Sequence, residues 1–243
     1  MTVAPVSESV RPIAPRLPVH LAPPISARLV VLASARRVIA LLGALCALAI
    51  AAHFDGGRLL LFVDRPVEKF VIAHRSGTLD AIFNRLSFFG STQVVLIGGG
   101  VLALAALPRC RAVATLTVTA TLARPLLEFT LKNLVARDRP DIDRMTRGVG
   151  YSFPCGHVMA AAILWGMVPI VVSLYVGSRR VWWITTTLCW LMVIGIGSSR
   201  VYLGVHWPTD VLGGFIAASL LLAGLELAYY RTHRRVSHRA WCN

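Results

Sequence analysis

Residues 158–176 of the chain read VMAAAILWGMVPIVVSLYV and contain no charged side chain. A helix needs about 20 apolar residues to cross the hydrocarbon core of a bilayer, because each residue advances it by about 1.5 Å. This stretch therefore predicts a transmembrane helix. Five further stretches are expected to cross the membrane once each: residues 38–53, 92–107, 112–131, 181–197 and 211–230. The predicted fold class is all-α, a polytopic membrane bundle of six transmembrane helices.

The composition agrees with a membrane protein. Hydrophobic residues make up 56% of the 243 residues and charged residues 15%, whereas a soluble domain carries about 25% charged residues. A disordered chain and an ordinary water-soluble globule are thereby excluded for most of the sequence. The formal net charge of +14 suits nucleic acid, an anionic membrane surface or a phosphorylated substrate. Because the chain is so apolar, we expect the lipid bilayer and a phosphorylated lipid as partners, and no nucleic acid.

The distribution of arginine predicts the orientation of the bundle. The short connections 108–111 and 177–180 each hold two arginines and no acidic residue, which places them in the cytoplasm under the positive-inside rule. Both chain ends then lie in the cytoplasm. The predicted organisation is a disordered basic tail at 1–35, a six-helix domain at 36–230 and a basic tail at 231–243.

Three segments are then expected outside: 54–91, 132–157 and 198–210. The first mixes apolar and charged residues and is expected to form helical pieces that lie along the membrane surface. The other two hold nearly all the residues with unusual chemistry, so they are the candidate functional segments.

The segment 132–157 begins with two cations at helical spacing. Lys132 and Arg139 are seven residues apart, so a helix over 132–139 would carry both on one face, and Pro140 would end it. The pair either binds phosphate or consists of two interfacial side chains that reach toward water. The other charges of this loop, Arg137 among them, are expected to form a solvated rim.

The same segment ends with Phe153-Pro-Cys-Gly-His157, directly before the 158–176 span. Pro154 and Gly156 ahead of a helix leave backbone N–H groups exposed, and a helix N-terminus attracts anions. His157 would lie in the first turn, where the helix dipole disfavours the imidazolium. A histidine at this position more often caps a helix than takes part in catalysis, so both roles stay open.

The segment 198–210 pairs a histidine with a carboxylate. Pro208 suits the first position of the last helix, which places Asp210 in its opening turn, with His206 just ahead. An orienting carboxylate fixes the tautomer of an imidazole and supports a positive charge on the ring. A capping aspartate beside an interfacial histidine is the plainer alternative.

Taken together, the three cations Lys132, Arg139 and Arg200 are expected to meet His157, His206 and Asp210 at one membrane face. Cations neutralise phosphate oxygens, one histidine can attack phosphorus, and the other can protonate the leaving oxygen. The sequence has no acidic cluster and no metal-ligand spacing of Cys and His, so we predict neither a metal nor another cofactor.

The sequence resembles the type 2 phosphatidic acid phosphatase (PAP2) superfamily of membrane lipid phosphatases. That family's motifs are Lys-x6-Arg-Pro, Pro-Ser-Gly-His and Ser-Arg-x5-His-x3-Asp, and this chain matches the first and third in order. The resemblance covers residues 131–214 closely. It implies a helical core like that of PAP2 enzymes and vanadium chloroperoxidase.

The resemblance also implies a role for each matching residue. His206 would attack phosphorus and form a phosphohistidine, oriented by Asp210, and His157 would protonate the departing oxygen. Water would then release phosphate from His206. The implied phosphate-binding residues are Lys132, Arg139, Cys155, Gly156 and Arg200.

Cys155 departs from the family pattern, because it stands where the family has serine. A thiol is a weaker hydrogen-bond donor than a hydroxyl, and nearby cations would lower its pKa. We expect activity to be weakened by about tenfold and not abolished. Cys155 is not expected to be a nucleophile itself, since cysteine phosphatases resemble Cys-x5-Arg and residue 161 is alanine.

Arg124, Glu128 and Lys132 are spaced four residues apart, so they form a ladder on one helix face. Ionisable groups at membrane depth are usually paired or functional. The plainer interpretation is a buried ion pair that positions the helix; the alternative is that Glu128 holds Lys132 in place for the site.

The function predicted from these features is a metal-independent lipid phosphatase at the outer face of a bacterial cytoplasmic membrane. Its substrate would be a polyprenyl diphosphate, phosphatidylglycerophosphate or phosphatidic acid. Two alternatives remain: a lipid phosphotransferase that uses the same site, and a membrane or transport protein whose site is weakened.

Overall fold

The structure is a computed structural model that describes residues 27–142 and 144–232. These residues form helices joined by turns and loops, and contain no strand. In chain order the elements are α1 (Ala27–His53), η1 (Phe54–Gly57), α2 (Arg58–Ala73), α3 (Gly77–Phe88), α4 (Thr92–Ala106), α5 (Arg111–Val135), α6 (Gly156–Ser173), α7 (Arg179–Tyr202) and α8 (Pro208–Thr232). The all-α prediction is confirmed for the described part of the chain. Most of the predicted tails lies outside the described residues, and α1 begins before the predicted boundary at residue 36.

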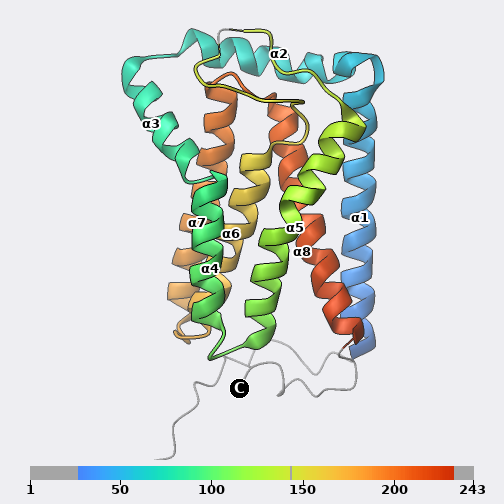
Figure 1. Cartoon of the computed structure of the whole chain (residues 1–243), viewed down its shortest axis with the longest axis vertical. Helices are drawn as coiled ribbons and strands as arrows, with labels where there is room; N and C mark the ends of the chain where they lie inside the picture. The colour runs from blue at the N-terminus through green and yellow to red at the C-terminus, as the bar shows by residue number, and fades with distance from the viewer. Residues whose placement is uncertain (1–26, 143, 233–243) are drawn as a thin grey trace, which may run out of the picture.

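Six long helices lie side by side as a bundle: α1 and α4 to α8 (Figure 1). The central helix is α6, which packs against α4, α5, α7 and α8. Helix α2 lies across one end of the bundle, and the loop between α5 and α6 covers the same end (Figure 1). The predicted surface pieces of segment 54–91 are therefore helical, and α2 closes one end of the bundle.

Four helices, α1, α6, α7 and α8, are long and apolar enough to cross a membrane, and the bent pair of α3 and α4 makes a fifth candidate. The angle between α3 and α4 is 47°. Helix α5 has 25 residues but carries the ladder Arg124, Glu128 and Lys132, which makes it more polar. All six predicted stretches are helical, and four or five qualify as spans by length and composition.

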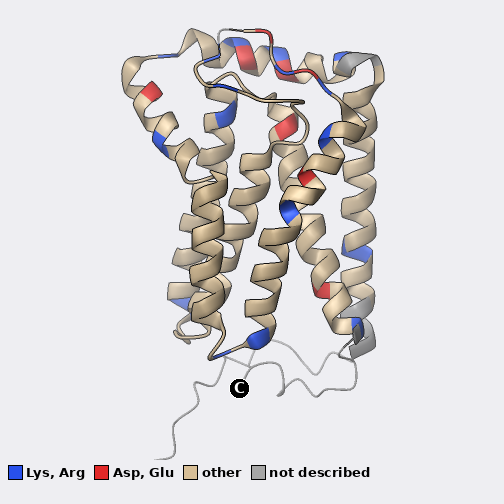
Figure 2. Ribbon diagram, viewed as in Figure 1, with Lys and Arg blue, Asp and Glu red and all other residues tan. Residues whose placement is uncertain are grey.

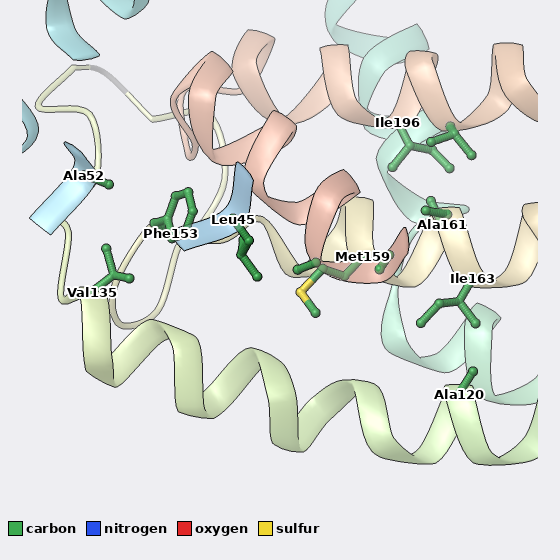
Figure 3. Close-up of a cluster of buried hydrophobic side chains, with 13 residues drawn as sticks. Leu45, Ala52, Ala120, Val135, Phe153, Met159, Ala161, Ile163 and Ile196 are labelled. Atoms are coloured by element: carbon green, nitrogen blue, oxygen red, sulfur yellow. The ribbon is translucent and has the colours of Figure 1, made fainter. Parts of the chain in front are cut away.

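Small and branched apolar side chains let the helices approach closely. Met159, Ala161 and Ile163 of α6 are buried against Ala120 of α5 and the side chains of α8. Figure 3 shows the cluster, with Phe153 at the end near Ala52 and Val135. Because Phe153 lies three residues before the start of α6 at Gly156, its burial helps to fix the start of that helix.

The predicted helix over residues 132–139 is wrong beyond residue 135. Helix α5 ends at Val135, and Ala136 takes the left-handed conformation with φ of 52°. Lys132 is therefore on the last turn of α5, whereas Arg139 lies on the irregular loop that follows. The two cations come from different local structures and do not share a helical face.

Candidate active site

His206 lies in the short loop between α7 and α8 and is 4% exposed. Its Nε2 is 3.3 Å from Nη1 of Arg139, and its Nδ1 is 3.5 Å from Oδ2 of Asp210. A guanidinium carries donors only, so a hydrogen bond between the two side chains requires Nε2 as the acceptor and the ring proton on Nδ1. Nδ1 faces Asp210 at ion-pair distance but makes no hydrogen bond among the described residues. The backbone N–H of His206 donates to the carbonyl of Arg200 at 3.3 Å. Arg139 therefore contacts the imidazole with its guanidinium, whereas Arg200 contacts His206 through its backbone carbonyl.

Asp210 is fully buried in the first turn of α8, which begins at Pro208 as predicted. Its Oδ2 accepts the backbone N–H of Trp207 at 2.9 Å. Its carbonyl accepts the backbone N–H of Cys155 at 3.0 Å, and this bond ties the start of α8 to the start of α6. Asp210 thus orients His206 from a position fixed on several sides.

Arg139 uses all five of its N–H groups. One contacts His206, and the others donate to backbone carbonyls at 2.6–3.1 Å: those of Val149, Gly150, Tyr151 and Val205. Arg139 therefore holds the loop before α6 against the loop that bears His206. The contact with Nε2 occupies the lone pair of that nitrogen.

The start of α6 brings Cys155 and His157 to His206. Cys155 is fully buried, precedes α6 as its N-cap, and its thiol lies within electrostatic range of the His206 ring. His157 lies half-buried in the first turn of α6. The charges of Arg200, His206, Arg124 and Lys132 all act on its imidazole, so His157 lies within their electrostatic range.

Gly156 is flanked by the carboxylate of Glu128. A side chain at residue 156 would begin inside the volume of that carboxylate. Glu128 in turn pairs with Lys132 Nζ at 3.1 Å and with Arg124 Nη1 at 2.6 Å. The predicted ladder is present, and it lies directly against the start of α6.

Arg200, on the last turn of α7, is buried. Its Nη1 donates to the hydroxyl of Ser87 at the end of α3. Among the described residues its Nε has no hydrogen-bond partner, so donor capacity remains. Arg200 is therefore suited to bind an anion beside His206.

The electrostatic surroundings shift the pKa values of His206 and Cys155 in opposite directions. Burial by itself would lower the pKa of the His206 imidazole. The Cys155 side chain and the Asp210 carboxylate outweigh burial, so the pKa of His206 is raised above its ordinary value. Burial would raise the pKa of the Cys155 thiol, but His206 and Arg200 lower it, in the predicted direction.

The sequence did not reveal several residues that contact the site. Arg137 was expected in a solvated rim, yet its side chain is 1% exposed and pairs with Asp210 at 2.7 Å. Asp64 of α2 and Thr209 of α8 are bonded to Arg137, and Ser87 holds Arg200. The sequence contains one signal for Asp64, which is an isolated acid in the apolar run LLLFVDRPV of α2.

Comparison with known proteins agrees with this geometry. The sequence model of the PAP2 superfamily matches residues 112–235, just over half of the chain. Phosphatidylglycerophosphatase B of Bacillus subtilis is 38% identical over 98 residues, which are 40% of this chain and 48% of that protein. An undecaprenyl-diphosphatase of Sulfolobus acidocaldarius is 33% identical over 75 residues, 28% of this chain and 29% of that protein. The matched parts thus span about half or less of these curated relatives.

Solved structures show the same fold. The crystal structure of the transmembrane PAP2-type phosphatidylglycerolphosphate phosphatase from Bacillus subtilis has a TM-score of 0.72 at 24% identity. The similarity covers 82% of this chain and 98% of that one. Aquifex aeolicus LpxE has a TM-score of 0.51 at 21% identity, over 69% of this chain and 95% of that one. With its three motif regions gathered around His206 and the family model matching from α5 to the end of α8, the chain belongs to the PAP2 superfamily.

Proposed function

We propose that the protein is a metal-independent lipid phosphatase of the membrane that works through a phosphohistidine on His206. The observation that carries the proposal is the arrangement around the imidazole. Nε2 faces Arg139 at 3.3 Å, while Nδ1 faces the buried Asp210. This tautomer leaves the lone pair on Nε2 for attack on phosphorus, with a carboxylate behind the ring to stabilise the cation that forms.

In the first step, Nε2 of His206 attacks phosphorus, and the bond from phosphorus to the leaving oxygen breaks. The negative charge on the phosphoryl oxygens is stabilised by the nearby cations Arg139, Arg200 and Lys132. His157 protonates the departing oxygen, which leaves as an alcohol or as a lipid monophosphate. In the second step, water gives a proton to His157 and attacks phosphorus, which releases phosphate and regenerates His206.

Metal independence is part of the proposal. In residues 27–142 and 144–232, no group of three or more His, Cys, Asp or Glu side chains is placed to hold a metal ion. The charge neutralisation that a metal often supplies in phosphoryl transfer is assigned instead to the guanidinium and ammonium groups. Activity that survives EDTA supports this assignment.

The proposed topology has six membrane crossings, with both chain ends in the cytoplasm and the site at the outer face. Helix α5 is included because its 25 residues suffice for a crossing, and its charged ladder is internally paired. The arginine-bearing connections of residues 108–111 and 177–180 lie at the end of the bundle opposite α2 (Figure 1). These short connections each hold two arginines and no acid, which fits the positive-inside rule, whereas Figure 2 shows basic and acidic residues together at the α2 end.

The proposed substrate is a lipid that carries a terminal phosphate. The relatives named above are a phosphatidylglycerophosphatase and an undecaprenyl-diphosphatase, so phosphatidylglycerophosphate and a polyprenyl diphosphate are the first candidates, with phosphatidic acid third. The test is phosphate release from each lipid by purified protein in detergent micelles with EDTA. We expect release from at least one lipid, and none from inorganic diphosphate alone. No release from any of the three would contradict the proposal.

A further inference from the structure

Arg137 bridges two buried carboxylates that come from opposite parts of the chain. Its Nη1 donates to Oδ1 of Asp210 at 2.7 Å, and its Nη2 donates to Oδ2 of Asp64 at 2.7 Å. Asp64 lies 73 residues before Arg137 and Asp210 lies 73 residues after it. All three side chains are 0–1% exposed, so water screens their interactions little.

Thr209 closes the network. Its hydroxyl accepts from Nη1 of Arg137 at 2.8 Å and donates to Oδ2 of Asp64 at 2.7 Å. Its backbone N–H donates to Oδ1 of Asp64 at 2.9 Å. Asp64 therefore reaches from α2 to the first turn of α8, one residue before the carboxylate that faces His206.

The network carries a net charge of −1, since two carboxylates surround one guanidinium. A buried uncompensated charge is costly, and the imidazole of His206, 3.5 Å from Asp210, is placed to balance it. A protonated or phosphorylated ring carries the positive charge that makes the assembly neutral. The network should therefore favour both the imidazolium and the cationic phosphohistidine.

We propose that Asp64 and Arg137 are positioning residues that set the basicity of His206 through Asp210. The inference rests on the proposed function, because it assigns the two residues a part in that reaction. Neither residue touches the phosphate; each acts on the charge and the position of the carboxylate behind the ring. The catalytic pair thereby depends on α2, a helix whose exposed side chains include apolar ones, such as Phe62 at 86% exposure, and cations such as Arg65.

The other charged or titratable groups around His206 come from three directions. Arg139 faces it from the loop after α5, Cys155 and His157 from the start of α6, and Arg200 from the end of α7. We expect these groups to stay in place when Asp64 or Arg137 is substituted, because those two side chains bond to each other, to Thr209 and to Asp210. A difference between variants therefore isolates the buried network.

The test measures kcat/KM against pH for the wild type, Asp64→Asn and Arg137→Gln in the same micelles. The acid limb of this profile reports the base that must be neutral in the free enzyme, and the ionisation of the substrate is common to all variants. Asp64→Asn removes a negative charge, so the acid limb should move to lower pH by about one unit. Arg137→Gln removes a positive charge, so the limb should move to higher pH. KM should change little in either variant, because the network does not contact phosphate.

The matched control is Glu226→Gln, which removes an acid further along α8 that pairs with Arg37 at 3.8 Å and is not bonded to Asp64, Arg137 or Asp210. Its acid limb should stay at the wild-type position. Thermal unfolding of each variant gives its folded fraction, and either network variant alone suffices if the other fails to fold. An acid limb that stays at the wild-type pH in a folded network variant would make the network purely structural and overturn the inference. Failure of the proposed function is a separate result, since the wild type would then release no phosphate.

Discussion

The carboxylate of Glu128 fills the space in which a side chain on residue 156 would begin. It is held there by Lys132 on one side and Arg124 on the other. Glycine at position 156 is thus required by its neighbour on α5, in addition to any contact of its backbone with phosphate. The start of α6 and the last two turns of α5 fit together only because residue 156 has no Cβ.

Gly156→Ala should destabilise the protein and displace the Glu128 carboxylate. Forcing a methyl group into a filled site costs about 1–3 kcal/mol, and movement of Glu128 would carry Lys132 away from the site. We expect a lower midpoint of thermal unfolding in detergent and a loss of most phosphate release. The matched control is Gly166→Ala on the same helix, where a Cβ would meet nothing within 4 Å. Equal midpoints for the two variants would contradict the steric explanation.

Cys155→Ser should retain or raise phosphatase activity. A hydroxyl is a better donor to a phosphate oxygen than a thiol, and it cannot place a thiolate charge beside the anionic substrate. Because Cys155 helps raise the pKa of His206, the acid limb of the profile should also move to lower pH. The measurement is kcat/KM against pH. Abolished activity in a folded variant would contradict the prediction and show that the thiol itself is required for activity.

Ser87→Ala should weaken the handling of phosphate without touching the catalytic pair. The Ser87 hydroxyl accepts from Arg200, and a hydrogen bond to a charged group contributes about 1.5–3 kcal/mol. We expect kcat/KM to fall by about tenfold or more. Ser173→Ala removes a comparable hydroxyl bond, to Ile170, at the far end of α6 and should leave kcat/KM unchanged. A Ser87 variant as active as that control would show that Arg200 needs no support from α3.

The pH dependence of the wild type follows from the raised pKa of His206. The imidazole must be neutral to attack, so activity is present above its pKa and is lost as the pH falls through it. Since that pKa lies above the ordinary histidine value of about 6.5, the midpoint of the acid limb of kcat/KM should lie above that pH. A midpoint well below it would mean that burial outweighs Asp210 and Cys155.

The membrane helices and the grouping of the site residues were predictable from the sequence. Apolar runs identify helices directly, and Pro208 correctly marked the start of α8. The motifs of PAP2 proteins predict from the sequence alone that Arg139, Arg200, His206 and Asp210 lie together. Apolar runs, the position of a proline and the order of motifs can all be read from the linear sequence of one chain.

The end of α5 and the buried network were not predictable. Nothing in the sequence at Ala136 signals a left-handed residue, since alanine is a strong helix former, and Pro140 was the nearest visible stop. Arg137 looked like a loop cation because its partners lie 73 residues away on either side. Ser87 is separated from Arg200 by 113 residues. Contacts of this kind arise from tertiary packing and leave no periodic pattern.

The most direct test of the account is to trap the phosphoenzyme with a ³²P-labelled lipid phosphate that the wild type hydrolyses. Phosphohistidine survives alkali and is released by acid, so the wild type quenched during turnover should carry acid-labile label on the peptide that contains His206. His206→Ala, folded as judged by thermal unfolding, should carry no label and release no phosphate. Equal phosphate release by the two proteins would contradict the assignment of His206 as the nucleophile.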